Sequence, residues 1–355
     1  FVFIDKTEPR KFLINSDNFE KFEYLHRKSD DWKYWRKKLS DVGSKGIPVF
    51  FRIENSEIKD FGLAFLYKVP FTYSPKEINN IHQKIDWNSG ADLAQCIFGF
   101  SAKENDNQSA LKGRIQFSPA KPINEPIPFT DRIRTTLGSP RASYYPIYIV
   151  QTPQTVNDNI VEKYITYNDR NAQLKWKRYP VHNSVTNYPS AGNDDINTEF
   201  LPLKSGIQFE SYIRFHNLRS PELGALLSAI SFHGNEKNLF HSIGMAKPMG
   251  FGKISINYSL EPEANANRDP DFYMAAFERE MNHFLGKDWI KTEQIKELFT
   301  MAWDKKELLK NVDLSYMVMS TSREDNQFAR AKNFNKYLKL YTELTGTFFQ
   351  PASIS

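Results

Sequence analysis

The sequence predicts an α+β fold with a ferredoxin-like, or RNA-recognition-motif-like, core, and three consecutive segments carry that prediction. Residues 207–215 alternate apolar and polar side chains with period two, which is typical of a half-buried strand. Ser220–Glu222 then supply an N-cap, a first-turn proline and an early acid for a helix. A glycine-rich loop follows and runs into a second alternating stretch, 253–258. Strand, helix, loop and strand in this order match the second half of a βαββαβ unit.

The expected helix has a single apolar face. Its inward positions are three or four residues apart, as an amphipathic helix requires, and are Leu223, Leu226, Leu227 and Ile230. A strand before this helix and another after it would cover that face. The helix is therefore expected to pack on the sheet of the core.

Three regions are expected along the chain. Residues 1–90 form an insert, with a charged aromatic helix and a β-hairpin whose strands, 47–53 and 61–69, flank a polar turn. Residues 91–260 hold the core, and within it 151–204 is polar and lacks periodicity, which predicts a long loop. Residues 261–355 begin with a linker-like stretch and continue with helical spacing, which predicts a helical C-terminal extension.

Composition restricts the class of protein without defining it. The chain has 355 residues and a net charge of +5, from 47 Lys and Arg against 42 Asp and Glu. That mild excess permits a nucleic-acid partner but does not require one. The sequence has no apolar run long enough to span a membrane, which predicts no membrane association. The one cysteine, Cys96, fits a reducing cytoplasm and is expected to be an inert core thiol.

The loop after His241 combines glycines with cations. They are Gly244, Lys247, Gly250, Gly252 and Lys253. Glycine tolerates positive φ and lets another molecule approach the backbone, so that N–H groups can face an anion. The flanking lysines add positive charge for phosphates. Phe251, between two glycines, either stacks on a base or anchors the loop to the core. The spacing matches neither Walker A nor a dinucleotide fingerprint.

Several blocks of sequence together resemble a known family. They are DLAQCIFGF, ALKGRIQFSPAKP, LGSPRASYYPIYIVQ, LKWKRYPVHN, LKSGIQFESYIRFHNLRSPELGALLSAISF, HSIGMAKPMGFGKISI and YMVMSTSREDNQFARAKNFNKYLKLY. In this order they resemble CRISPR-associated RAMP proteins, and specifically the larger, insertion-bearing branch of the type III effector backbone subunits. The family's first strand and helix have no counterpart, since residues 1–45 look like a helical insert. The chain is therefore expected to lack that strand and helix, either as a fragment or because another polypeptide supplies them.

The resemblance implies an RNA-binding backbone subunit that holds guide RNA for recognition of target RNA in antiviral defence. Its partners would be guide RNA, target RNA and other CRISPR effector subunits in the cytoplasm, with 151–204 acting as a thumb. RNA contacts are expected from the glycine loop, including Phe251, and from residues of two upstream blocks. Those residues are Lys112, Gly113, Arg114, Lys121 and Arg141. The basic entrance to the strand after Arg114 would meet backbone phosphates.

Catalysis is the principal open question at this stage. His241 precedes the glycine loop and is a candidate general acid or base for a RAMP-type endoribonuclease. A lone histidine at a helix end is, however, more often a hydrogen-bonding or capping residue. Asp194 and Asp195 could bind a divalent ion, or could form a solvated turn. No catalytic residue is assigned, no metal site is expected, and binding needs no cofactor; Mg²⁺ would enter only if target RNA is cleaved. A protein-only scaffold is the third alternative.

Overall fold

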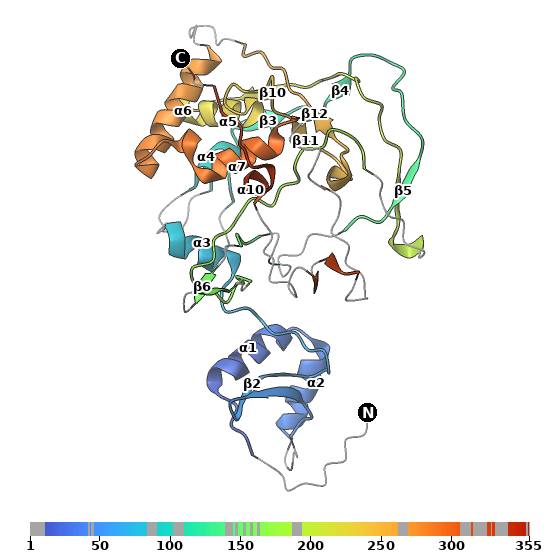
Figure 1. The fold of residues 1–355 in the computed structure, drawn as a ribbon, viewed down its shortest axis with the longest axis vertical. Coiled ribbons are helices and arrows are strands. Elements are labelled where there is room, and N and C mark those ends of the chain that lie inside the picture. The colour runs from blue at the N-terminus through green and yellow to red at the C-terminus, as the bar shows by residue number, and fades with distance from the viewer. Residues whose placement is uncertain are drawn as a thin grey trace. The chain divides into compact units, whose positions relative to one another are not determined.

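The computed structural model describes residues 11–41, 43, 46–83, 91–101, 110–138, 145, 148–151, 154–156, 159–161, 164–186, 194–261, 269–305, 314, 325–327, 329–330, 340–352 and 354 (Figure 1). Contacts divide the chain into two compact units. Unit 1 comprises residues 1–74 and 167–169, and unit 2 comprises 75–166 and 170–355. Helices and short antiparallel strands occur in both, which confirms the predicted α+β class. No helix in the described ranges is long and apolar enough to cross a membrane.

Unit 1 contains two helices where the sequence predicts one. Helix α1 spans Ser16–His26 and helix α2 spans Asp30–Leu39. The break follows from a local cap, because the Ser29 hydroxyl accepts a hydrogen bond from the Trp32 N–H and starts a new helix. Each helix contributes one aromatic ring to a small core, in which Phe22 lies edge-on to Trp32 at 4.9 Å.

The hairpin of unit 1 packs on that core. Strands β1 (Phe50–Glu54) and β2 (Glu57–Gly62) pair antiparallel around a turn at Asn55 and Ser56. Both turn residues have positive φ, at 52° and 65°, which is the backbone of a tight two-residue hairpin turn. The second strand therefore begins four residues earlier than predicted. On it, Phe61 stacks on the Phe22 ring at 4.6 Å.

Unit 2 is built around a long antiparallel pair of strands. Its six short segments are β3 (Ile115–Phe117), β4 (Lys121–Pro122), β5 (Ile133–Thr135), β8 (Thr198–Phe200), β9 (Phe209–Glu210) and β10 (Ile213–Phe215). β3 pairs with β10, β4 with β9, and β5 with β8. Hydrogen bonds between these pairs, such as Thr130 N–H to the Pro202 carbonyl at 2.8 Å, continue the same alignment. We call residues 114–136 together with 197–216 the ribbon.

The ribbon bends because its register slips. Ile115 lies opposite Phe215, Pro122 opposite Phe209, Phe129 opposite Leu203 and Thr135 opposite Thr198, so that each successive pairing has one extra residue on the 114–136 side. Extra residues of this kind are β-bulges, which twist and bend a pair of strands. The single strand predicted over 207–215 is accordingly divided in two. The segment closed by the ribbon is 137–196, compared with the loop 151–204 expected from composition.

Helix α5 (Ser220–Ser231) packs on one end of the ribbon. Its predicted apolar face is confirmed, since Leu223, Leu226 and Leu227 are buried with Met274 of helix α6 (Pro270–Leu285). Ile115, Ile213 and Phe215 of the ribbon border this cluster. α5 and α6 cross closely at Gly224, where a Cβ would lie 1.9 Å from the Tyr273 carbonyl oxygen.

The C-terminal part is helical where it is described. The 3₁₀ turn η4 (Trp289–Lys291), helix α7 (Glu293–Ala302) and helix α10 (Tyr341–Thr345) follow α6. A second core forms there from Phe232, Leu239, Ile295, Phe299, Ala302 and Phe349. The remaining elements of unit 2 are α3 (Pro75–Gln83), α4 (Leu93–Phe98), β6 (Gln154–Val156), β7 (Asn159–Val161), η2 (Asp194–Ile196), β11 (His241–Ser242), η3 (Lys247–Met249) and β12 (Lys253–Ile254). The described strands pair two by two, so the ferredoxin-like sheet stays a prediction.

The expectation that Cys96 is a core thiol is wrong. Helix α4 starts with a capping box between Asp92 and Gln95, and this fixes which side of the helix faces inward. The buried residue is the neighbouring Ile97, at 5% exposure, while Cys96 is partly exposed. Ile97 therefore occupies the inward position of this helix turn, and the apolar neighbours of Cys96 in sequence do not bury it.

Candidate nucleic-acid interface

The glycine-rich loop forms a hairpin in unit 2. β11 and β12 pair antiparallel, with His241 opposite Ile254, and the loop between them contains η3. The Ile243 N–H donates to the Gly252 carbonyl at 2.9 Å and so extends the pairing by one residue. We call residues 241–254 the glycine hairpin. Its exposed residues include Ile243 and Met245, which flank Gly244.

The three glycines of this hairpin have different roles. All have positive φ, which favours glycine. A Cβ at Gly250 would lie 2.5 Å from the Ser184 carbonyl oxygen, and one at Gly252 would lie 1.8 Å from the Ile243 carbonyl oxygen. At Gly244, no atom of the described residues lies within 4 Å of a Cβ position. Close contacts within the chain therefore account for Gly250 and Gly252, and of the three only Gly244 faces open space among the described residues. RNA contact at these glycines stays a prediction.

The two lysines of the hairpin also differ. Lys253 forms an ion pair with Asp304 at 2.7 Å and lies 5.2 Å from the centre of the Phe240 ring. Lys247 donates to the Gly244 carbonyl and pairs with no carboxylate among the described residues. Lys247 can therefore reach a phosphate by exchanging one neutral contact, whereas Lys253 would have to leave a partner of opposite charge.

Phe251 attaches the glycine hairpin to the ribbon. Its ring lies edge-on to Phe200 of β8, with 5.6 Å between centroids. Of the two interpretations open from the sequence, anchoring is the one this geometry supports. The contact places the hairpin beside the β5–β8 end of the ribbon.

Arg114 lies inside the fold rather than on its surface. Its side chain is 13% exposed and forms a bidentate ion pair with Glu222 of α5. Its remaining N–H groups donate to the Cys96 and Asn217 carbonyls, so that all five donors are used. Hydrogen bonds to Glu222 are the main reason why the pKa of Arg114 is raised. The prediction that Arg114 contacts RNA is therefore corrected, because no donor is left for a phosphate.

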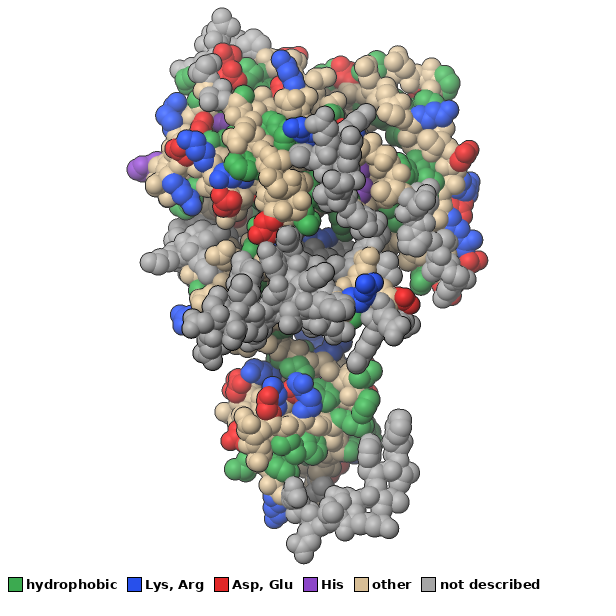
Figure 2. All heavy atoms as spheres, viewed as in Figure 1, with side chains coloured by type: hydrophobic (Ala, Val, Ile, Leu, Met, Phe, Trp, Pro, Cys, Tyr) green, Lys and Arg blue, Asp and Glu red, His purple; other side chains and the backbone are tan. Residues whose placement is uncertain are grey.

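The other upstream candidates are divided between surface and interior. Lys112 and Lys121 are exposed and pair with no carboxylate in the described part of the chain. Gly113 is needed for packing, since its Cβ would lie 2.8 Å from the Phe98 carbonyl oxygen. Arg141 lies outside the described residues. On the face drawn in Figure 2, cationic and acidic side chains are interspersed. The interface therefore rests on individual lysines.

His241 is held by structural contacts. Its Nε2 atom lies 2.7 Å from the Ile230 carbonyl oxygen, to which it donates, and its ring stacks on Phe232 at 4.2 Å. Burial lowers the pKa of His241, and the nearby Arg178 charge adds to that effect, although the Ile230 hydrogen bond opposes it. A neutral imidazole with one nitrogen committed to a carbonyl is a hydrogen-bonding residue of the fold. This geometry gives no support to the catalytic interpretation.

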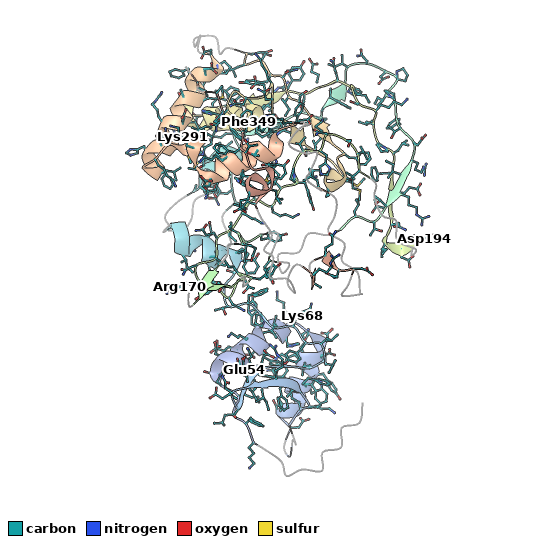
Figure 3. The ribbon with its side chains drawn as sticks, viewed as in Figure 1. Glu54, Lys68, Arg170, Asp194, Lys291 and Phe349 are labelled. Carbon is teal, nitrogen blue, oxygen red and sulfur yellow. The ribbon has the colours of Figure 1, made fainter. Side chains whose placement is uncertain are left out.

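Asp194 and Asp195 start η2, at the end of the ribbon next to β5 (Figure 3). Asp194 is exposed and forms an ion pair with Arg134 of β5. In the described ranges, no group of three or more His, Cys, Asp or Glu side chains is placed to hold a metal ion. The pair therefore closes the ribbon end as a polar turn.

Sequence reasoning missed one cation close to the glycine hairpin. Arg178 lies with its guanidinium 5.6 Å from the centre of the Phe232 ring and 3.5 Å from the Phe240 carbonyl oxygen. It belongs to the block LKWKRYPVHN, which was noted for its resemblance alone. Its distance in sequence from the hairpin, about sixty residues by numbering, hides the proximity.

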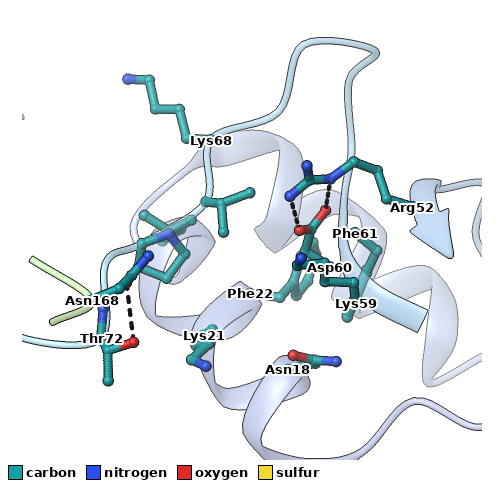
Figure 4. Close-up of a pocket in the computed structure, with 13 residues that line it drawn as sticks. Asn18, Lys21, Phe22, Arg52, Lys59, Asp60, Phe61, Lys68, Thr72 and Asn168 are labelled. Atoms are coloured by element: carbon teal, nitrogen blue, oxygen red, sulfur yellow. Dashed lines mark hydrogen bonds and ion pairs between the residues drawn. The ribbon is translucent and has the colours of Figure 1, made fainter. Parts of the chain in front are cut away.

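Unit 1 has a separate cavity of about 240 Å³ (Figure 4). The cations around it are Lys21, Arg52, Lys59 and Lys68. The first three form ion pairs with Asp17, Asp60 and Glu54. Lys68 points away from the cavity (Figure 4). Pockets for small ligands usually enclose roughly 300–1,000 Å³. A small cavity with neutralised cations is a weaker candidate than the glycine hairpin.

Comparison with known proteins matches this chain to no protein-family model and to no curated protein.

Proposed function

We propose that this chain is an RNA-binding backbone subunit of a type III CRISPR effector complex, which holds guide RNA for recognition of target RNA in antiviral defence. The family resemblance in the sequence blocks is the reason for naming this class. Guide RNA, target RNA and other effector subunits would be its partners. The bent ribbon and the segment it closes would serve as the thumb.

The observation that carries the proposal is the exposed tip of the glycine hairpin beside the ribbon. Ile243, Gly244 and Met245 are exposed there, and Lys247 follows without a carboxylate partner in the described part of the chain. An open glycine backbone with apolar side chains and a cation suits RNA, whose bases stack on apolar surfaces and whose phosphates attract lysine. Phe251 fixes this tip to the ribbon.

Binding without cleavage is the form of the proposal that the residues favour. A general base must reach the proton that it removes. His241 is half-buried and bonded to the Ile230 carbonyl, which leaves it poorly placed for that role. Sequence specificity would come from pairing between guide and target, while the protein would hold backbone groups.

RNA binding by the purified chain tests the proposal. We expect filter binding of a labelled single-stranded RNA to weaken when Lys112, Lys121 and Lys247 are changed to Ala. Each change should reduce the slope of log affinity against log salt by up to about one. The matched control changes Lys287, Lys291 and Lys296, which lie between the start of α6 and the end of α7, to Ala, so that the two triple variants have the same net charge. Equal affinity for the two triple variants would contradict the proposed interface, and no RNA binding by the wild-type chain would contradict the function.

A further inference from the structure

Arg178 is a cation for which the described residues supply no counter-charge. Its Nε atom is buried and has no hydrogen-bond partner among those residues. One terminal nitrogen lies 3.5 Å from the Phe240 carbonyl oxygen, at the limit for a hydrogen bond. No carboxylate in the described ranges forms an ion pair with it. Most of its five N–H donors are therefore unused.

Other partly buried cations of unit 2 have an acidic group nearby. Arg114 has Glu222, and Lys253 has Asp304. The half-buried Lys175 forms no ion pair among the described residues. Burial lowers its pKa, but the negative charges of Glu297 and Glu343 act in the opposite direction. For Arg178, burial alone lowers the pKa, and no acidic group acts against it. Arginine keeps its proton in proteins even so.

A half-buried cation that contacts one aromatic ring and one carbonyl, and that pairs with no carboxylate among the described residues, is unfavourable in the free protein. Binding sites commonly sacrifice local stability for function, so an unmatched cation marks a candidate binding site. The missing partner must be an anion that accepts several N–H groups at once. Phosphate is the group best suited to the planar fork of arginine, since two parallel N–H···O bonds can form.

The position of Arg178 identifies where that anion would lie. It contacts the Phe240 carbonyl, directly before β11, and its charge acts on His241, the first residue of that strand. Lys253, on the paired strand, lies over the Phe240 ring. Arg178 is thus at the base of the glycine hairpin, whose tip carries Lys247. We propose that Arg178 binds a phosphate group at the base of the glycine hairpin. On the function proposed above, that group is an RNA phosphodiester.

Substitution of Arg178 separates this role from a structural one. Arg178→Met removes the charge and keeps the length of the side chain, so the melting temperature should stay the same or rise. The affinity for a labelled 20-nucleotide RNA should fall about tenfold, as expected for a charged hydrogen bond, and the salt slope should fall by about one. Arg178→Lys should keep the salt slope but bind less tightly than wild type, because the fork is lost.

The control is Arg170→Met, an exposed arginine eight positions upstream by numbering that is labelled in Figure 3. It should leave both RNA affinity and melting temperature unchanged. A lower melting temperature for Arg178→Met with wild-type RNA affinity would overturn the proposal and make Arg178 a packing residue.

Inorganic pyrophosphate distinguishes this proposal from the proposed function. It should raise the melting temperature of wild type and of Arg170→Met, but not that of Arg178→Met. A shift of equal size in all three would overturn the phosphate site. If pyrophosphate acts through Arg178 while wild type binds no RNA, the phosphate site stands and only the assignment to RNA fails.

Discussion

Changing Arg114 to Met tests whether this residue supports the fold or contacts RNA. The Arg114 side chain is 13% exposed and that of Glu222 is 5% exposed, so solvent screens their ion pair weakly. Removing one partner of a buried pair typically destabilises a protein by about 3–5 kcal/mol, because the other charge stays buried alone. We expect Arg114→Met to lower the free energy of unfolding of unit 2 by that amount.

The double variant Arg114→Met with Glu222→Leu sharpens the test. Replacing both members of a buried pair by apolar residues of similar size is often nearly neutral. The double variant should therefore be more stable than Arg114→Met alone, although it carries one more substitution. Glu222 also accepts the Arg219 N–H at 2.7 Å, at the start of α5, and the double variant loses that cap. The double variant should accordingly regain only part of the stability that Arg114→Met loses relative to wild type.

The pH dependence of the same pair has a defined sign. Burial by itself raises the pKa of Glu222, but hydrogen bonds from Arg114 and from the Arg219 backbone outweigh it, and the net pKa is lowered. The stability that Glu222 contributes is then present above its unfolded pKa and lost as the pH falls through its folded pKa. In Arg114→Met that acid sensitivity should shrink.

Urea unfolding followed by circular dichroism measures these stabilities, and filter binding measures RNA affinity under native conditions. An unchanged unfolding midpoint for Arg114→Met, together with weaker RNA binding, would refute the structural role. It would restore Arg114 as a phosphate contact. If Arg114→Met is less stable in urea but its folded fraction binds RNA normally, the result supports a structural role for the Arg114–Glu222 ion pair.

Three further outcomes follow from the geometry. Gly250→Val should lower the melting temperature, measured by differential scanning fluorimetry, because its Cβ would meet the Ser184 carbonyl oxygen and φ is positive; an unaffected melting temperature would contradict this contact. Lys253→Ala should reduce stability in urea more than it reduces RNA affinity, since Asp304 loses its partner; the reverse order would make Lys253 an RNA contact. Burial lowers the pKa of His241 and of three other histidines, so the unfolded chain binds protons first and stability should fall as the pH drops below about 6.5; urea midpoints that stay constant from pH 8 to 5 would contradict it.

Local patterns predicted the parts of the fold that depend on neighbours in sequence. The face of α5 could be read from the spacing of Leu223, Leu226 and Leu227, because a helix repeats every 3.6 residues. The start of α5 was wrong by one position. Ser220 is the better N-cap by residue type, yet the cap is Arg219, because the Glu222 carboxylate accepts its N–H. Glu222 is held there by a residue 108 positions away, which no local pattern contains.

The candidate site was predicted less well for the same reason. Glycine next to lysine indicates an anion site only when the glycine faces open space, and that depends on which distant segment lies opposite. Ser184 occupies the space beside Gly250, whereas nothing lies beside Gly244. A basic residue at the entrance to a strand looks the same in sequence whether it faces a phosphate, as proposed for Lys112, or a buried carboxylate, as for Arg114.

The placement of charge decides which cations remain for RNA. A net charge of +5 in 355 residues is too small to attract RNA through a broad electrostatic field. Arg114 and Lys253 are matched by carboxylates inside unit 2. Lys247 and Arg178 are not matched among the described residues, and both belong to the glycine hairpin or its base. Under the proposed function, affinity built on so few phosphate contacts would be supplemented by contacts from neighbouring subunits along a shared guide. A subunit that held RNA within such an assembly would need only these few contacts, because each copy would add its own contacts to the same strand.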